Sequence, residues 1–278
     1  MAERTTVKIA AKANLSLNIT GRADGYHLLD SVFASLGIYN TVTAVKRAGK
    51  CIDIVFSDTG IDPRFNRARM AADMMSKRYG GLGAEISVVN NIPTGRGLGG
   101  SSADAAGVII ALNRLFGLTD DQRQLNEIAA SVGSDTPFML RGGLARVTGR
   151  GEKINYFSGR TDKKIVVVSP ASEVSTAECF RRFDDREDAG LAADTDAVVA
   201  ALIRGEDFTP FIGNALYPAA VSLNPDIAEA YKAVASAGGR PVMTGSGSAC
   251  LGFFDSMPDS FAGRQTFLTD AGVITEDN

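Results

Sequence analysis

The sequence has no tryptophan, one histidine and only three cysteines in 278 residues. The single histidine, His27, excludes a histidine-rich metal centre, and a Ser-His-Asp triad would have to use that residue. Cys51, Cys179 and Cys250 are odd in number and far apart, which excludes a disulfide framework or a cysteine zinc site. This cysteine usage is typical of a reducing cytosol, so we expect a cytoplasmic protein.

Long apolar runs and an excess of one charge are also absent. No run approaches the about 20 apolar residues of a membrane-spanning helix, and residues 1–8 contain no hydrophobic leader segment. A net charge of −3 offers no basic surface for nucleic acid or an anionic membrane, so we expect neither as a partner. With 45% apolar and 22% charged residues, the composition predicts a globular protein of one large or two modest domains.

Glycine, in contrast, is concentrated in one stretch. Residues 92–106 read IPTGRGLGGSSADAA, and an apolar run continues to Leu115. Glycine permits positive φ angles and lets backbone N–H groups approach a ligand closely. A helix beginning near Ser102 would direct its unpaired N–H groups and the positive end of its dipole at this loop. The stretch therefore predicts an anion site, most often a phosphate site.

Different kinds of loop compete for this stretch. A Walker-type loop needs a Lys-Ser/Thr pair after its last glycine, but Gly100 is followed by Ser101 and Ser102, so that interpretation fails. A purely structural alternative is a glycine-rich hairpin exit in which Ser101 or Ser102 caps a core helix.

The dinucleotide fingerprint G-x-G-x-x-G is literally present as Gly95, Gly97 and Gly100. That fingerprint belongs between two parallel strands. Residues 85–90 alternate polar and apolar, as a half-exposed strand does, and residues 125–132 have the period of a helix where a second strand is required. The context therefore disfavours a dinucleotide site.

Periodicity predicts the remaining elements. Strands are expected at 7–10, 15–20, 32–45, 51–56, 86–89, 164–170 and 250–254, and helices at 67–79, 102–116, 125–132 and 225–237. A turn is expected at 21–27 and an acidic surface loop at 184–196. Because strands and helices mix without strict alternation, we predict an α+β fold in two lobes, the second beginning near residue 164.

Residues 93–106 resemble the central motif of the GHMP small-molecule kinases. Three further regions resemble this family in the same order, at 11–17 with 24–27, at 131–152 and at 244–249. The resemblance covers nearly the whole chain and is best between Lys12 and Glu152. The segments DGYH and GSDTPF narrow it to the branch that phosphorylates a cytidine-diphosphate-linked methylerythritol.

The resemblance implies a reaction and a fold. The branch uses ATP, with Mg²⁺, to phosphorylate the 2-hydroxyl of its substrate in the non-mevalonate route to isoprenoid precursors. The implied fold has an N-terminal ATP-binding catalytic domain over residues 1–160 and a C-terminal ferredoxin-like α/β domain over 161–278. The protein would act as a monomer or weak homodimer.

The resemblance also assigns the catalytic and nucleotide residues. Asp135 matches the aspartate that accepts the hydroxyl proton, and Lys12 the lysine that orients it and neutralises charge near the γ-phosphate. No carboxylate pair requires a metal held by the protein alone, and Ser102 would lie near the Mg²⁺ that arrives with ATP. The expected ATP-binding residues are Asn66, Pro93, Thr94, Gly95, Arg96, Gly97, Leu98, Gly99, Gly100, Ser101, Ser102 and Ala103.

On the substrate side, Tyr26 would stack on the cytosine, opposite Phe180, while His27 would hydrogen-bond the edge of the base. Arg181 stands where a lysine is common, and either cation can meet a phosphate. The expected substrate-binding residues are Asn14, Tyr26, His27, Phe33, Thr176, Phe180 and Arg181.

Each assignment has a structural alternative. Lys12 would be a solvated lysine at a strand edge, Asp135 a helix cap and Phe180 a core residue. Tyr26 and His27 would be turn residues packed on the sheet. The glycines at 245 and 247 would form only a tight turn.

The sequence also departs from the family pattern. Ala11 replaces a common proline, the stretch between Gly21 and Asp24 is one residue short, and Asn40 stands where an aspartate is frequent. Two other functions remain open: another GHMP kinase acting on homoserine or a mevalonate-type alcohol, and a catalytically silent nucleotide-binding relative. The DGYH segment disfavours the first, and retention of both Lys12 and Asp135 disfavours the second.

Overall fold

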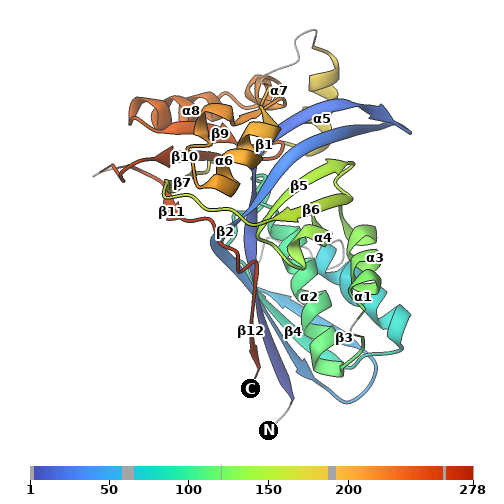
Figure 1. Ribbon diagram of the computed structural model, residues 1–278. Helices are drawn as coiled ribbons and strands as arrows, with labels where there is room; N and C mark the ends of the chain where they lie inside the picture. Colours follow the sequence, from blue (N-terminus) through green and yellow to red (C-terminus); the bar gives the residue numbers. More distant parts are fainter. Residues whose placement is uncertain (1–2, 58–65, 120, 187–191, 259–260, 278) are drawn as a thin grey trace.

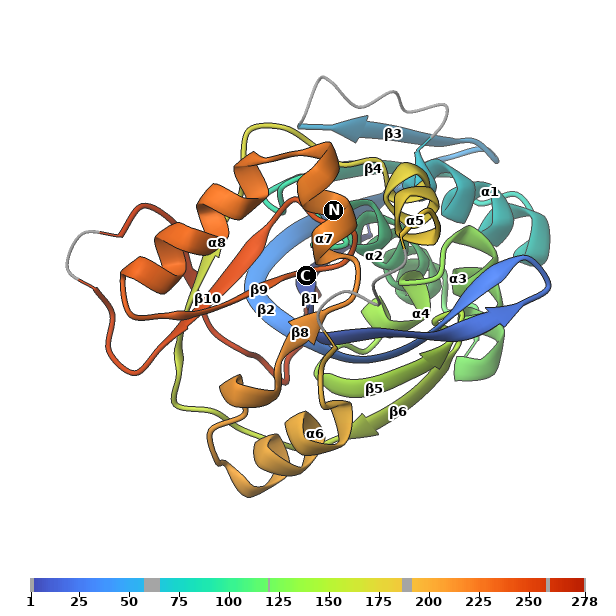
Figure 2. The same ribbon diagram turned by 90° about the horizontal axis from the view of Figure 1, so that it is seen from above.

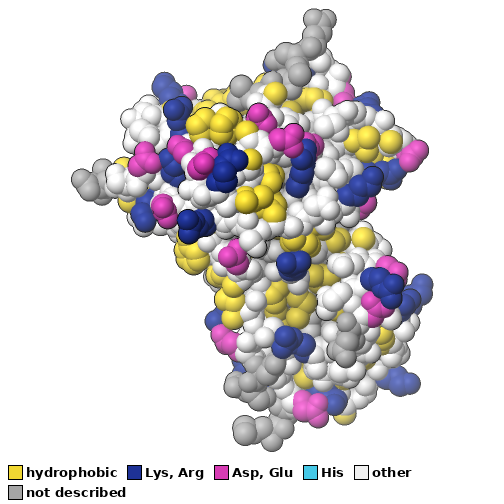
Figure 3. Space-filling view, in the orientation of Figure 1, with side chains coloured by type: hydrophobic (Ala, Val, Ile, Leu, Met, Phe, Trp, Pro, Cys, Tyr) yellow, Lys and Arg dark blue, Asp and Glu magenta, His cyan; other side chains and the backbone are white. Residues whose placement is uncertain are grey.

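The computed structural model describes residues 3–57, 66–119, 121–186, 192–258 and 261–277. They form two lobes that meet at a waist, which the space-filling view shows as a narrowing of the outline (Figure 1, Figure 3). Lys/Arg and Asp/Glu side chains are interspersed on the face seen in Figure 3.

Two long antiparallel strands, β1 (Arg4–Ala23) and β2 (Tyr26–Lys46), run from the lower lobe into the upper one (Figure 1). The hairpin between them turns at Asp24 and Gly25, whose φ angles of 51° and 78° lie in the left-handed region that aspartate and glycine tolerate. The turn predicted at 21–27 is therefore confirmed but is limited to residues 24 and 25, because β1 extends to Ala23 and β2 begins at Tyr26. The strands expected at 7–10 and 15–20 are parts of one strand.

The larger sheet has eight strands, in the order β12-β1-β2-β4-β3, with β5 and β6 continuing from β2 and β8 pairing with β1. Its remaining strands are β3 (Ile52–Phe56), β4 (Ala84–Val89), β5 (Leu144–Gly149), β6 (Lys153–Phe157), β8 (Gly213–Asn214) and β12 (Val273–Asp277). Because β12 pairs with β1, both ends of the chain lie together at the bottom of Figure 1.

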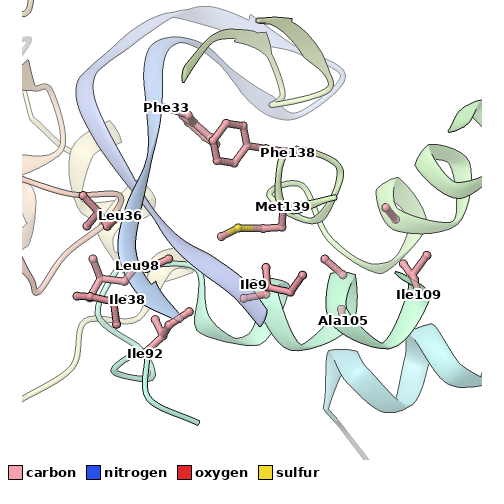
Figure 4. Packing of buried hydrophobic residues seen from close by; sticks show 14 of the residues in the cluster. Ile9, Phe33, Leu36, Ile38, Ile92, Leu98, Ala105, Ile109, Phe138 and Met139 are labelled. Carbon is pink, nitrogen blue, oxygen red and sulfur yellow. The ribbon is translucent and has the colours of Figure 1, made fainter. Parts of the chain in front are cut away.

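Helices cover one face of this sheet. They are α1 (Arg67–Tyr79), α2 (Gly100–Phe116), α3 (Gln122–Val132) and α4 (Thr136–Met139). The central helix, α2, approaches the sheet closely at Gly107, where a Cβ atom would lie 2.5 Å from a methyl group of Val42. Figure 4 shows Ala105 of α2 beside Ile9 of β1, with Ile109 further along the helix and Met139 of α4 above Ile9. This packing fixes the start of α2 relative to β1.

The smaller sheet has the order β11-β7-β10-β9, and all its pairs are antiparallel. Its strands are β7 (Lys164–Val168), β9 (Arg240–Met243), β10 (Cys250–Phe254) and β11 (Arg264–Thr266). This is the strand order of a ferredoxin-like sheet, although residues 255–258 and 261–263, which precede β11, contain no helix.

The helices of the second lobe are α5 (Thr176–Asp184), α6 (Thr195–Arg204), the 3₁₀ helix η1 (Thr209–Phe211), α7 (Tyr217–Leu223) and α8 (Asp226–Ser236). Seen from above, α8 and the small sheet lie on one side of the curved β1–β2 pair, and α1 and α3 on the other (Figure 2). Within the described ranges, none of the helices has the length and apolar character needed to traverse a bilayer.

The α+β fold in two lobes is confirmed, with two local corrections. The helix expected from Ser102 begins at Gly100, because Gly99 takes the N-cap position with a φ of 75° and no side chain caps the helix. The serine-cap interpretation is therefore wrong. The loop expected at 184–196 is wrong at both ends, since α5 extends to Asp184 and α6 begins at Thr195; residues 187–191 lie outside the described residues.

The division into domains at residue 160 stays a prediction. The chain changes sheets between β6 and β7, as expected, but β8 and β12 return to pair with β1 of the larger sheet.

Candidate functional site

A cavity of about 240 Å³ lies where the two lobes meet. Its walls come from β1 and β2, the glycine loop with the start of α2, the start of α1, the segment before α4, and the second lobe. The lining residues are Lys12, Asn14, Leu17, Leu29, Phe33, Arg67, Gly95, Arg96, Gly97, Gly99, Gly100, Ser101, Ser102, Ser134, Asp135, Val174, Thr176, Phe180, Leu216, Gly245, Ser246 and Gly247. The fold thus brings residues of all four family-like regions to one place, although residues 24–27 of the first region do not line the cavity.

Lys12 lies in the middle of β1 and is only 4% exposed. Its Nζ donates to Asn14 Oδ1 at 2.7 Å, lies 3.6 Å from Asp135 Oδ2 and sits 5.0 Å from the centroid of the Phe33 ring. A lysine is buried only when partners compensate for the lost hydration, and here they do. The interpretation of Lys12 as a solvated edge residue is wrong.

Asp135 occupies the N-cap position of the short helix α4, but its side chain makes no capping hydrogen bond. The carboxylate is partly exposed and faces Lys12 across the cavity. Asp135 therefore stands at the start of a helix, as the structural alternative held, but its side chain does not act as a cap. The carboxylate oxygens are available to a ligand, while Lys12 supplies a nearby positive charge.

The glycine loop is held against the second lobe. Gly95, Gly97 and Gly99 have φ angles of 66°, 78° and 75°, in the left-handed region that glycine adopts without strain. Gly97 O accepts a hydrogen bond from Thr244 Oγ1 at 3.2 Å, and a Cβ atom on Gly97 would lie 2.2 Å from Thr244 O. Glycine is required here both by the conformation and by the contact.

Arg96 makes a second connection to the small lobe. Its guanidinium donates to Ala171 O at 2.5 Å and to Ser248 Oγ at 3.2 Å, while Arg96 O accepts from Ala249 N at 3.1 Å. The 244–249 loop is thus a turn, as the structural alternative held, and also a wall of the cavity.

Positive charge and unpaired N–H groups converge on this part of the cavity. Lys12, Arg67 and Arg96 are among the lining residues, whereas Asp135 is the acidic residue among them. The first turn of α2, beginning at Gly100, leaves backbone N–H groups without partners in the helix, and its dipole adds positive potential. The arrangement suits a polyanion such as a triphosphate.

Arg67, which sequence reasoning missed, is a functional candidate. It begins α1, and its Nη1 donates to Ser102 Oγ at 2.7 Å. The Ser102 hydroxyl is almost fully buried, at 1% exposure of the residue. An arginine at the start of an apolar-period helix carries no local signal, because the residue it contacts lies on another helix.

The expected nucleotide residues divide into three groups. Those that line the cavity are Gly95, Arg96, Gly97, Gly99, Gly100, Ser101 and Ser102. Leu98 and Ala103 are fully buried core residues, while Pro93 and Thr94 lie outside the lining. Asn66 also lies outside it and caps α1, with Oδ1 accepting from Ala68 N at 2.7 Å.

The expected substrate residues are only partly assembled. Asn14, Phe33, Thr176 and Phe180 line the cavity, whereas Tyr26, His27 and Arg181 do not. Asn14 also links the lobes, because its Oδ1 accepts from Gly245 N at 3.0 Å as well as from Lys12. Arg181 is exposed and pairs with Glu178 at 3.0 Å. Thr176 shares a hydrogen bond with Ser246 at 2.9 Å.

The expected pairing of Tyr26 with Phe180 differs from the structure. The ring beside Phe180 belongs to His27, with centroids 4.7 Å apart, and Tyr26 is 59% exposed beneath the guanidinium of Arg150. His27 Nε2 is held by Asp184 Oδ1 at 2.7 Å. This bond places the imidazole against α5 and against Phe180, a tertiary contact that the DGYH segment alone does not specify.

The oxygen groups of the cavity fit a metal ion that arrives with the nucleotide better than a metal ion held by the protein alone. Within the part of the chain that the structure describes, no group of three or more His, Cys, Asp or Glu side chains could hold a metal ion. Mg²⁺ usually binds one or two protein groups together with substrate phosphates. The oxygen donors of the cavity include the Asp135 carboxylate and, on the glycine loop and the start of α2, the hydroxyls of Ser101 and Ser102.

Known proteins share this architecture. Residues 66–143 match the N-terminal domain of the GHMP kinases. A homoserine kinase from Cytophaga hutchinsonii has the same fold, with a TM-score of 0.69 at 19% identity over 92% of this chain and 87% of that one.

Proteins of one named enzyme show higher sequence identity to this chain. A 4-diphosphocytidyl-2-C-methyl-D-erythritol kinase of Pelotomaculum thermopropionicum is 36% identical over 257 residues, covering 89% of this chain and 88% of the relative. Its counterpart in Streptomyces coelicolor is 36% identical over 255 residues, covering 87% and 85%. The crystal structure of a 4-(cytidine 5'-diphospho)-2C-methyl-D-erythritol kinase superposes with a TM-score of 0.76 at 31% identity, covering 89% of each chain. With this likeness along both chains, the protein belongs to the 4-diphosphocytidyl-2-C-methyl-D-erythritol kinase family and is an ATP-dependent kinase.

Proposed function

We propose that the protein transfers the γ-phosphoryl group of ATP to the 2-hydroxyl of 4-diphosphocytidyl-2-C-methyl-D-erythritol. The observation that carries this proposal is the buried Lys12, 3.6 Å from Asp135, in a cavity lined by the glycine loop. Such an arrangement places a proton acceptor and a positive charge beside a phosphate site. The family relationship supplies the substrate.

Asp135 is the proposed base. Its carboxylate would accept the proton of the attacking hydroxyl, and Lys12 would hold the carboxylate in place. Asn14 fixes Lys12 in turn, through the 2.7 Å hydrogen bond to its Nζ. Because phosphoryl transfer is mainly a matter of position and charge, this fixed pair would account for much of the rate enhancement.

The glycine loop and the first turn of α2 are the proposed triphosphate site. Their backbone N–H groups, with the cations of Lys12, Arg67 and Arg96, would neutralise the phosphates. Mg²⁺ bound with ATP would supply further positive charge on the phosphate oxygens. The Ser102 hydroxyl, already oriented by Arg67, and the Asp135 carboxylate are the groups proposed to meet that ion.

Phe180 is the proposed platform for the cytosine ring, since its side chain lines the cavity. Binding on the face that His27 covers would require His27 to move, because its ring, tilted by 33°, has its centroid only 4.7 Å from that of Phe180 and leaves no room for a base between them. Tyr26, His27 and Arg181 would then join the site. We also propose that the protein is cytoplasmic and acts as a monomer or weak homodimer.

Nucleotide recognition tests this proposal against the alternative that the substrate is homoserine or a mevalonate-type alcohol. CMP and CDP should raise the thermal unfolding temperature, whereas homoserine and mevalonate should not. Phe180→Ala should abolish the shift with CMP, and Phe211→Ala, an exposed phenylalanine of the same lobe outside the cavity, should keep it. Stabilisation by homoserine or mevalonate alone would contradict the proposed substrate. Stabilisation by ATP without turnover on any alcohol would contradict the proposed phosphoryl transfer.

A further inference from the structure

A buried carboxylate outside the cavity connects both ends of the glycine loop. Asp104 lies in the first turns of α2 and is 2% exposed. It accepts a hydrogen bond from Asn40 Nδ2 at 2.7 Å and another from Asn90 Nδ2 at 3.0 Å. Asn40 comes from β2 and Asn90 follows β4, so the carboxylate joins three elements.

Asn40 extends this network to the residues that begin the loop. It is fully buried, and its Oδ1 accepts from both Asn91 N and Ile92 N at 2.7 Å. The loop leaves the sheet at Ile92 and enters α2 at Gly100. Asp104 therefore holds the helix after the loop, and through Asn40 it holds the chain before the loop.

We propose that Asp104 and Asn40 form a positioning pair that sets the backbone of the phosphate-binding loop for ATP. The inference rests on the proposed nucleotide role of that loop. Neither side chain lines the cavity, so both act through the loop and not on the reacting atoms. Because the loop is held at both ends by one network, a change within the network should displace the N–H groups that meet the phosphates.

The direction of each hydrogen bond makes the pair testable. The Asn40 amide cannot turn over, because its oxygen already accepts from two backbone N–H groups; its nitrogen must therefore face an acceptor at position 104. Asn40→Asp would place a second carboxylate against Asp104 in a buried site, where like charges repel strongly. Asp104→Asn alone should weaken ATP binding less. The Asn90 Oδ1 has no partner among the described residues, so the Asn90 amide can turn and accept a hydrogen bond from the new amide at position 104.

Exchanging the two side chains should restore the network. In Asn40→Asp/Asp104→Asn, the new carboxylate at position 40 accepts from Asn91 N and Ile92 N, as the original amide oxygen did. Its second oxygen accepts from the new amide at position 104, whose own oxygen accepts from Asn90 Nδ2. The long bond from Asn40 Nδ2 to Gly100 O, at 3.5 Å, is lost. The other bonds remain and one is reversed, while the number of charges is unchanged.

The test compares the wild type with the two single variants and the double variant. The readouts are the KM for ATP, kcat and the directly measured ATP affinity, each at a temperature where thermal unfolding shows every protein folded. Asn40→Asp should raise the KM for ATP at least about tenfold, because small displacements of a binding loop are costly. The double variant should return to within about threefold of the wild type. Asn155→Asp, which adds a carboxylate at an exposed position of β6, should change nothing.

The outcomes separate the inference from the proposed function. A wild type that neither binds nor uses ATP would refute the proposed function itself. With an active wild type, an unchanged KM in Asn40→Asp, or a double variant no better than Asn40→Asp, would overturn the positioning pair. Should Asn40→Asp fail to fold, a double variant that folds and binds ATP normally supports the pair, and one that stays unfolded or binds ATP poorly overturns it.

Discussion

At the scale of single residues, the buried charge of Lys12 is stabilised by Asn14 and Asp135 in the cavity. Replacing it by methionine keeps an apolar stem of similar length and removes the charge beside Asp135. Lys12→Met should lower kcat about 100-fold or more, because a preorganised charge near the transferred phosphoryl group is lost. Steady-state turnover measures this. Lys8→Met, on the same strand but exposed and paired with Glu276, is the control. Turnover within about threefold of wild type in Lys12→Met would contradict the role.

The buried carboxyl of Asp104 should make the stability of the protein depend on pH. Burial raises the pKa of Asp104 to about 6 from an ordinary 3.8, because lost hydration outweighs the hydrogen bonds from Asn40 and Asn90. As the pH rises, the carboxyl loses its proton in the unfolded chain before it does so in the folded protein. The protonated carboxyl therefore contributes its full stability below about pH 4, and this contribution is lost as the pH rises through about 6. The difference in pKa corresponds to roughly 3 kcal/mol.

Urea unfolding of wild type and Asp104→Asn across this pH range isolates that contribution. The stability of the wild type relative to the variant should fall between about pH 4 and pH 6 and stay level above that range. Parallel pH curves for the two proteins would show that the carboxyl of Asp104 titrates alike in the folded and unfolded chains.

At the scale of elements, the glycine loop and the 244–249 loop form one contact. Gly97→Ala combines a φ of 78° with a Cβ atom 2.2 Å from Thr244 O, so the two loops must separate. We expect a loss of about 1–3 kcal/mol in stability and at least about tenfold weaker ATP binding. Thermal unfolding and direct nucleotide binding measure both quantities.

Gly117→Ala is the matched control for this substitution. Gly117 has a φ of 57°, but a Cβ atom there would meet no atom of the described residues within 4 Å, so the variant reports left-handed strain without a collision. It should lose some stability and keep its ATP affinity. Equal ATP affinity in the two variants would mean that the contact between the loops does not shape the nucleotide site.

The elements that could be predicted from the sequence have local signals, whereas no signal was found for β5, β6, β8, β9, β11, β12, α5, α6 and α7. The alternation at 86–89 and the helical period at 67–79 correspond to β4 and α1. The start of α2 was misplaced because the backbone conformation of Gly99, and not a capping serine, begins the helix. The helical ends of the acidic segment 184–196 were missed for a related reason, since its charged residues resemble those of a loop.

The site was harder to predict because it depends on contacts between distant segments. Lys12, Asp135 and the glycine loop could be named from their motifs, and the structure brings them together. Arg67 carried no signal, since its function comes from a serine on another helix. The position of His27 beside Phe180 depends on Asp184, 157 residues along the chain, which no local pattern specifies.

At the scale of the whole molecule, the two lobes share one cavity because β1 and β2 run through both. The smaller sheet supplies the 244–249 loop, α5 of the same lobe supplies Phe180, and the larger sheet supplies Lys12 and holds the glycine loop. Return of β12 to β1 ties the end of the chain to the strand that carries Lys12. The proposed nucleotide and alcohol would therefore meet only where the lobes meet.

Release of ADP from Mg-ATP, with and without 4-diphosphocytidyl-2-C-methyl-D-erythritol, tests the central claim most directly. ADP should appear only when that substrate is present, and Asp135→Asn should reduce its rate at least about 100-fold while ATP still binds. ATP binding without substrate-dependent ADP release, or an Asp135→Asn variant as fast as the wild type, would contradict the account.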